Sequence, residues 1–289
     1  MRKKFLLLLA LLFLLAGVIF ILPAVRDHAP EQTKESATEE TESTTETESE
    51  TPTETETESE TETEETTEEE TKGPGDPVDR EKVETHLIIA SDTHYMSPSM
   101  TDYGAAFDSL VNSNDGKVIR YQPQLWQAFK SEVLAANPDA LILSGDLSLN
   151  GEKANHLEFS EKLHEIEEAG VPVYVIPGNH DINKPDAGEY FGDQRTDVES
   201  VTSEEFREIY ADFGYNEAKS GAPDSLSYLV ELNDTTWLMM LDTTVCEPEN
   251  EVYGEIKEGT LEWMEECLKE AYAEGITVIP VGHRSEERR

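Results

Sequence analysis

The sequence predicts a mixed α/β domain built around a parallel sheet, and three features of its second half support this prediction. From residue 82 onward, short apolar runs alternate with longer amphipathic stretches. The runs are rich in Val, Ile and Leu, which is typical of strands buried on both faces. The amphipathic stretches are long enough to connect parallel strands as crossover helices. About 215 residues follow residue 72, enough for one domain with a substantial core.

The elements of this domain are predicted from local pattern. Apolar, β-type runs predict strands over 86–91, 139–144, 171–176 and 276–281. Helical spacing of apolar residues predicts helices over 122–136, 153–169, 203–210 and 258–273. Gly170 stands directly after the second of these helices as a C-terminal cap. Two further apolar runs joined through Asn233 and Asp234 predict a β-hairpin, with strands at 225–232 and 235–241.

The first 25 residues predict an export segment. Residues 1–4 form a basic region, and residues 5–25 are uncharged, apolar and rich in Leu. This run is close to the roughly 20 residues that span a bilayer and is longer than the apolar part of most cleaved signals. We therefore expect a signal anchor or, as the alternative, a cleaved signal peptide. The preceding basic residues favour an N-terminus inside, which places the rest of the chain at the cell surface or outside the cell, attached to the membrane by this segment.

Residues 26–83 predict a disordered acidic stalk. Between residues 31 and 72 the chain contains 18 Glu, 15 Thr and 4 Ser. Such a segment has no apolar surface to bury, so it cannot offset the conformational entropy lost on ordering. Repulsion among its carboxylates keeps it extended. We expect a spacer that holds the domain over 84–289 away from the surface.

Charge and cysteine content limit the possible partners. The chain has 22 Lys and Arg against 63 Asp and Glu, a formal net charge of −41. This charge excludes a protein that coats nucleic acid and favours cations as small partners. Cys246 and Cys267 are the two cysteines, too few for a disulfide scaffold, and we expect both to be structural or free. No feature predicts an oligomeric state.

Metal-binding residue types directly follow four of the predicted strands. These strands are followed in order by D-T-H, G-D, G-N-H-D and G-H. In an α/β sheet, ligands bind beyond the carboxyl ends of the strands, so we expect the four motifs to converge. Each motif alone is weak, because Gly-Asp after a strand also forms ordinary turns. Asp, Asn and His together suit Mn, Fe, Zn or Ni rather than calcium, so order, placement and donor type predict a metal centre.

This constellation resembles the calcineurin-like metallophosphoesterase superfamily, whose signature is D-x-H, G-D, G-N-H-[DE], a later His and G-H-x-H. The resemblance covers residues 84–283, and it looks most like the extracellular bacterial branch similar to cyclic-nucleotide phosphodiesterases. It implies a four-layer α/β/β/α sandwich and two divalent metal ions.

The resemblance also implies roles for individual residues. Asp92 and His94 would bind the first ion, Asp146 would bridge both, and the second ion would be bound by Asn179 and His283. His180 would contact the phosphate and protonate the leaving oxygen. We expect the neighbouring Asp181 either to orient His180 or to be an ordinary turn residue. His156 and His164 lie on the predicted helix 153–169, where we expect solvent-facing or packing roles. The stretch of about 25 residues after His94, which contains Asp102, Asn112 and Asp115, is expected to be a loop. It either shapes substrate access, as long loops in compact domains often do, or is an ordinary connection.

The sequence departs from the superfamily pattern after His283. Residues 284–289 read RSEERR, so G-H is not followed by the second His of G-H-x-H. The predicted sandwich is therefore C-terminally incomplete, and each ion lacks one imidazole. We expect either a truncated or frame-shifted form of a longer chain, or a natural short form that has lost catalysis.

Together these observations predict a metal-dependent hydrolase of small phosphate esters that acts outside the cytoplasm. Its substrate is either a phosphodiester or a phosphomonoester. The alternative is a surface-tethered module without catalysis, which binds a phosphorylated ligand or is a remnant that has lost the last metal ligands.

Overall fold

The structure is a computed structural model that describes residues 77–113, 117–247 and 250–283. All of these residues belong to one compact unit. The predicted basic region, the apolar run over 5–25 and the stalk up to residue 76 lie outside the described residues. Among the residues that are described, no helix is long and apolar enough to cross a membrane.

A three-stranded parallel sheet carries the first three predicted motifs. Its strands are β1 (Leu87–Ala90), β2 (Ala140–Ser144) and β3 (Val173–Ile176), with β2 in the middle. Every residue of β2 and β3 is buried, as the unbroken apolar runs predicted. The crossovers are α3 (Gln122–Ala136) and α4 (Lys153–Glu167). The parallel sheet and its two helices are therefore confirmed.

A second sheet contains the predicted hairpin and the last predicted strand. The order is β6 (Ser220–Gly221), β7 (Tyr228–Asn233), β8 (Thr236–Leu241) and β9 (Thr277–Gly282). β7 and β8 pair antiparallel, whereas β8 and β9 pair parallel through the crossover helix α6 (Glu258–Glu274). The strand that ends in G-H thus belongs to a different sheet from the other three motif-bearing strands.

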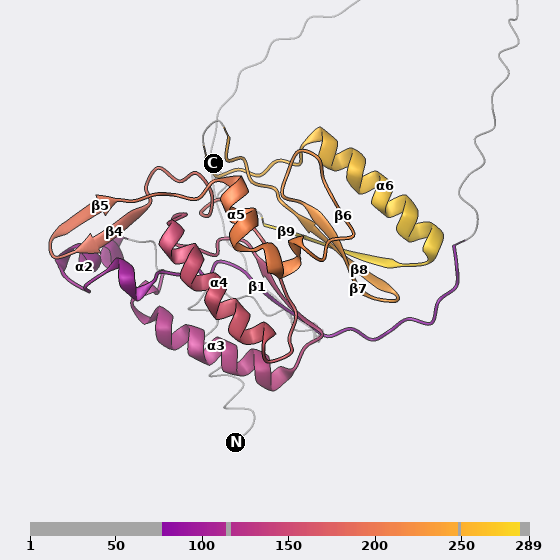
Figure 1. Ribbon diagram of the computed structural model, residues 1–289, viewed down its shortest axis with the longest axis horizontal. Coiled ribbons are helices and arrows are strands. Elements are labelled where there is room, and N and C mark those ends of the chain that lie inside the picture. The colour runs from indigo at the N-terminus through magenta and orange to yellow at the C-terminus, as the bar shows by residue number, and fades with distance from the viewer. Residues whose placement is uncertain (1–76, 114–116, 248–249, 284–289) are drawn as a thin grey trace, which may run out of the picture. The chain divides into compact units, whose positions relative to one another are not determined.

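The two sheets pack face to face between two helical layers. Alternate residues of β8 point to opposite sides, as the two-residue period of a strand requires: Leu238 and Met240 enter the central core, whereas Trp237 and Met239 pack against α6. Figure 1 shows α3 and α4 on one side of the sheets and α6 on the other. This is the predicted four-layer α/β/β/α arrangement.

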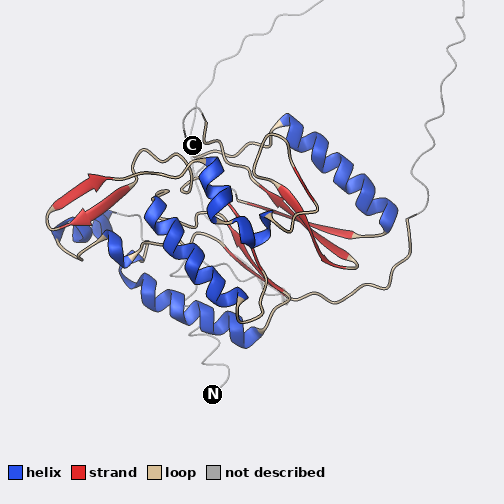
Figure 2. Cartoon of the chain, viewed as in Figure 1, coloured by secondary structure: helices blue, strands red, loops and turns tan. Residues whose placement is uncertain are grey.

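The expected loop after His94 is wrong, because this stretch is largely structured. It contains η1 (Pro98–Met100), α2 (Ala105–Ser113) and η2 (Ile119–Tyr121). Figure 2 shows α2 beside the hairpin of β4 (Gly188–Phe191) and β5 (Gln194–Asp197). Phe107 of α2 and Tyr190 of β4 belong to one small core. This packing comes from a segment about 80 residues away in sequence, so the local pattern gave no sign of it.

The remaining predicted elements and both cysteines match the structure. α5 (Ser203–Ile209) begins with a capping box between Thr202 and Glu205 and leads into the kinked turn η3 (Ala211–Tyr215). Cys246 and Cys267 are free and buried.

Candidate metal centre

The predicted metal ligands meet where the strands of both sheets end. Asp92, His94 and Asp146 each offer a ligand atom, and these atoms all lie within 4.8 Å of one another. His94 Nε2 lies 3.6 Å from Asp92 Oδ1 and 3.7 Å from Asp146 Oδ2. His283 approaches the same carboxylate from the second sheet, with its Nε2 3.4 Å from Asp146 Oδ1. Asp146 is therefore the shared centre of the site.

Backbone contacts hold the first two motifs together. Asp92 N donates to the Gly145 carbonyl at 3.0 Å, and His94 N donates to the Asp146 carbonyl at 2.9 Å. Asp92, His94 and Asp146 all have positive φ, at 56°, 41° and 52°. Non-glycine residues rarely adopt this conformation, and where it persists it commonly marks a functional site. The three ligand-bearing residues thus share a strained backbone that brings their side chains into one place.

Two glycines allow the loops to approach this closely. A Cβ atom on Gly178 would overlap the backbone nitrogen and Oδ1 of Asp146. A Cβ on Gly145 would lie 2.6 Å from the ring of His283, and Gly145 also has φ 91°. Glycine is therefore required at both positions by the proximity of ligand side chains.

Asn179 lies at the same junction. It is 6% exposed and stands between Gly178 and His180, whose amide donates to Asp146 Oδ1 at 2.8 Å. The structure thus brings Asn179 to the end of β3 beside the Asp146 turn.

The surroundings of Asp146 favour the ionised form of its side chain. Burial raises the pKa of Asp146, but the imidazoles of His283, His94 and His180 outweigh burial and hold this pKa below its usual range. Burial lowers the pKa of His283, yet Asp146 outweighs it and raises that pKa to about 9. Asp146 is accordingly ionised at neutral pH.

The donor atoms fit a bound metal. His283 Nδ1 donates to the Ser144 carbonyl at 2.7 Å, which leaves Nε2 as the atom that faces Asp146. This Nε2 is buried and has no hydrogen-bond partner among the described residues. Its nearest acceptor is Asp146 Oδ1 at 3.4 Å, longer than a normal hydrogen bond, and a divalent cation between imidazoles and carboxylates would contact both groups.

His180 faces the centre from the turn after β3. Its Nδ1 lies 3.1 Å from the Leu149 carbonyl oxygen and 2.9 Å from Asn150 Oδ1. A carbonyl oxygen only accepts, so Nδ1 is the donor and Nε2 is left for exchange. The ring packs edge-on against His94 at 4.9 Å. Burial is the largest cause that lowers the pKa of His180, to about 4, with Lys117 and Lys184 acting in the same direction and Asp146 opposing them.

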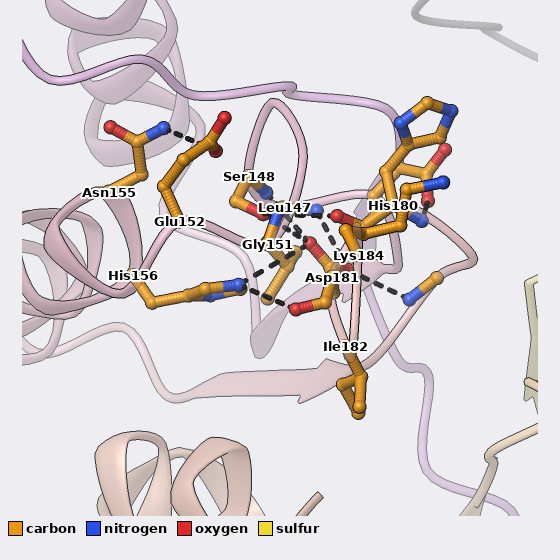
Figure 3. Close-up of polar contacts among 12 residues, drawn as sticks. Leu147, Ser148, Gly151, Glu152, Asn155, His156, His180, Asp181, Ile182 and Lys184 are labelled. Atoms are coloured by element: carbon orange, nitrogen blue, oxygen red, sulfur yellow. Dashed lines mark hydrogen bonds and ion pairs between the residues drawn. The ribbon is translucent and has the colours of Figure 1, made fainter. Parts of the chain in front are cut away.

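The expected role of Asp181 in orienting His180 is wrong. The Asp181 side chain is fully buried, and its carboxylate accepts from Leu147 N at 3.0 Å, from Ser148 N at 2.8 Å and from Gly178 N at 2.8 Å. Figure 3 shows this carboxylate within the polar network, away from the His180 ring. Asp181 instead joins the turn that follows Asp146 to the turn that carries Asn179 and His180.

Sequence reasoning missed Asn150 as the partner of His180. Its only signal was a polar residue four positions after Asp146 in the strand-to-helix connection. His156 has the packing role that was one of its expected roles: it is fully buried, with Nδ1 2.8 Å from the Tyr210 hydroxyl and Nε2 3.0 Å from the Asp181 carbonyl. In the sequence, His156 is spaced from Phe159 and Leu163 so that all three lie on one face of the helix, and this spacing indicated a buried position.

A family model for calcineurin-like phosphoesterases matches residues 85–288. Among solved structures, the chain is similar to a dimetal phosphatase from Danio rerio, with 13% sequence identity, a TM-score of 0.43 and coverage of 69% of each chain. No curated protein matches the sequence.

Proposed function

Because the chain belongs to the calcineurin-like phosphoesterase family, we propose that it is a metal-dependent hydrolase of phosphate esters. The observation that supports this most directly is the convergence of Asp92, His94 and His283 on the buried carboxylate of Asp146. These donors are oxygen and imidazole atoms at the carboxyl ends of strands, where α/β folds bind their ligands.

We propose two groups of ligands that share Asp146. Asp92, His94 and Asp146 would hold one divalent ion, and Asp146, Asn179 and His283 would hold the second. When bound, such a pair of ions supplies an acidified water and neutralises charge on the phosphate oxygens. The positive-φ turns and the glycine contacts hold the donors in place before a ligand arrives, which lowers the cost of organising the site.

His180 is the proposed catalytic residue. Its Nδ1 proton is held by Leu149 and Asn150, so a proton exchanged with substrate is exchanged at Nε2. This fixes one tautomer and one ring orientation, which general acid–base chemistry requires. We also propose that the protein acts outside the cytoplasm, attached to the membrane through residues 5–25.

Substitution of Asp146 tests the function. Asp146→Ala removes the carboxylate shared by both ligand groups, so we expect loss of most bound Mn²⁺, measured by mass spectrometry of the dialysed full chain. Hydrolysis of bis(p-nitrophenyl) phosphate and of p-nitrophenyl phosphate should fall by at least about a thousandfold. Asp193→Asn, at an exposed position between β4 and β5, is the matched control and should retain both properties.

Two outcomes would contradict this proposal. Retention of two ions per chain by Asp146→Ala would exclude the assigned ligands. Weak binding of one ion without turnover by the unsubstituted chain would favour the module that binds without catalysis.

A further inference from the structure

Glu152 carries a carboxylate that is enclosed within the protein at the start of α4. The residue is 0% exposed, although burying a carboxylate is costly unless donors satisfy it. Glu152 stands at the N-cap of α4, where a side chain normally accepts a hydrogen bond from one of the first helical amides. Its side chain makes no such bond, so capping of the helix does not account for the buried carboxylate.

The Glu152 carboxylate instead receives donors from both directions along the chain. Its Oε2 accepts from the Asn150 amide at 2.8 Å and from Asn155 Nδ2 at 2.7 Å. The Asn155 side chain is fixed in turn, because its Oδ1 accepts from the Ser97 amide at 2.8 Å. Figure 3 shows the Asn155 amide turned toward the Glu152 carboxylate. Glu152 therefore ties the backbone of Asn150 to a buried anchor on α4 and on the segment that follows His94.

Asn150 is the residue through which this anchor reaches the metal centre. Its Oδ1 lies 2.9 Å from His180 Nδ1, and the Leu149 carbonyl oxygen lies 3.1 Å from the same nitrogen. His180 is itself attached to the centre, because its amide donates to Asp146 Oδ1 at 2.8 Å. A contact from the His180 ring to Asn150 and a second from the Asn150 amide to Glu152 thus connect the ring with the buried carboxylate.

The position of Asn150 controls the state of the His180 ring. Asn150 is half-buried in the connection between β2 and α4, where water competes for its side-chain amide. If its backbone is not held, Oδ1 moves away from Nδ1, and the ring is then free to rotate or to carry its proton on Nε2. General acid–base chemistry requires a ring in one orientation with a defined proton, so a fixed Asn150 backbone favours that chemistry.

We propose that Glu152 is a positioning residue, which holds Asn150 against His180 and thereby fixes Nε2 as the nitrogen that exchanges a proton with substrate. The inference rests on the proposed function, because the catalytic role of His180 belongs to it. It goes further by naming the residue on which that role depends and the esters that are affected when the residue is lost.

This role predicts a dependence on the leaving group. A water oxygen forms the new bond to phosphorus as the ester P–O bond breaks, His180 Nε2 gives its proton to the departing oxygen, and the proton that the water loses restores the ring. Phenol, with a pKa of about 10, needs that proton, whereas the nitro groups of 2,4-dinitrophenol stabilise the departing anion without it. Loss of a positioned general acid therefore slows phenyl esters much more than dinitrophenyl esters.

Glu152→Ala tests this dependence in the full chain with Mn²⁺. For phenyl phosphate and methyl phenyl phosphate we expect kcat to fall about thirtyfold, and for the matching 2,4-dinitrophenyl esters less than about threefold. KM and Mn²⁺ affinity should stay within about threefold, because the Glu152 side chain bonds to Asn150, Asn155 and Gly188 and not to a proposed metal ligand.

Further variants separate positioning from general damage. Glu152→Gln keeps an oxygen for the Asn150 and Asn155 donors, and its nitrogen takes the place of Oε1, where the Gly188 amide is 3.5 Å away. It should restore kcat for the phenyl esters to within about threefold of the unsubstituted value. Glu161→Ala, at an exposed position of α4, is the matched control and should leave all constants unchanged. If Glu152→Ala does not fold, as judged by circular dichroism, Glu152→Met replaces it, because it fills the same volume without a carboxylate.

The ring of His180 provides a readout that does not depend on turnover. Spectra that resolve the ring nitrogens are recorded for the full chain with Zn²⁺ at about pH 8, where an imidazole is neutral, and the His180 signals are assigned from their absence in His180→Gln. We expect the unsubstituted chain to carry the His180 proton on Nδ1 alone. The form protonated on Nε2 should appear in Glu152→Ala and be absent from Glu152→Gln.

The outcomes separate the two proposals. If Glu152→Ala slows both kinds of ester equally, slows neither, or leaves His180 with its proton on Nδ1 alone, the positioning role is excluded. Failure of Glu152→Gln to restore the phenyl esters excludes it as well. If the unsubstituted chain hydrolyses none of the esters while the proton position on His180 still depends on Glu152, the positioning of the ring stands and the proposed hydrolase function is wrong.

Discussion

At the scale of single residues, the geometry of the centre depends on two glycines without side chains as much as on the residues that carry donor atoms. Gly145 and Gly178 contribute no donor atoms, yet they are the positions where neighbouring ligand side chains leave no space for a methyl group. Gly178 faces the carboxylate that both ligand groups share. A small substitution there should therefore affect the metal centre as much as the loss of a ligand does.

Gly178→Ala tests this close approach. Its Cβ would overlap Asp146, so the turn must shift, and we expect the free energy of unfolding to fall by about 2–3 kcal/mol. Mn²⁺ affinity should fall at least about tenfold. Gly221→Ala, whose Cβ would meet only the Ser227 carbonyl at 3.4 Å, should change both quantities little. Equal behaviour of the two variants in calorimetry and metal titration would contradict the interpretation.

At the scale of elements, one buried carboxylate aligns two strand ends. Asp181 accepts hydrogen bonds from the turns after β2 and after β3. Four contacts, including one from Ser148 Oγ at 3.0 Å, make it an acceptor that an amide cannot replace, because an Asn amide nitrogen would face N–H donors. The register between the two ligand-bearing turns therefore depends on this side chain.

Asp181→Asn should uncouple the two turns. We expect a loss of about 3 kcal/mol in the free energy of unfolding in urea. We also expect Mn²⁺ affinity to fall about tenfold to a hundredfold, since supporting residues commonly have that effect. Ser148→Ala removes one of the four hydrogen bonds and should give a smaller effect in the same direction. Unchanged Mn²⁺ affinity in a folded Asp181→Asn protein would show that the turns hold their positions without it.

The C-terminal end of α4 should make stability depend on pH. Burial is the main cause that raises the pKa of Glu167 to about 7; Glu217 and Asp212 raise it further and the Val173 amide opposes them. Because the ordinary pKa of a glutamate side chain is 4.5, between pH 4.5 and about 7 the folded state holds a proton that the unfolded state has released. The free energy of unfolding therefore falls as the pH rises from about 4.5 to about 7.

Glu167→Gln removes this titration. The variant should be more stable than the unsubstituted chain by about 1 kcal/mol at about pH 8, an amount reduced for partial exposure, and should have no such advantage at about pH 5. Urea unfolding at the two pH values measures it. Glu168→Gln, at the exposed neighbouring position, should show no pH-dependent difference. A constant offset of Glu167→Gln at both pH values would show that titration is not the cause.

At the scale of the whole molecule, the sequence predicted the helices and strands whose positions depend on the local pattern of apolar residues. Buried runs such as β2 and amphipathic stretches such as α3 were predictable because their periodicity reflects burial in place. The convergence of the proposed ligands followed from a general property of strand ends. The packing of α2 against Tyr190 and the contacts of Asp181 were not predictable, because both depend on which distant segments meet.

The sequence pattern also could not predict that β9 belongs to the second sheet. A parallel pair formed through α6 looks in sequence like another crossover of the first sheet. Only the pairing of β8 with both β7 and β9 shows that the fourth motif approaches Asp146 from the opposite layer.

The origin of the proposed ligands in two sheets has a consequence for how the chain would acquire its metal centre during folding. Asp92, Asp146 and Asn179 follow strands of one sheet, whereas His283 follows β9 of the other and meets Ser144 only across the interface. Closing a contact between residues so far apart in sequence is slow and comes after local structure has formed. A refolding chain should therefore gain full metal affinity only when the two sheets have docked, which makes metal uptake a kinetic reporter of the last step of folding.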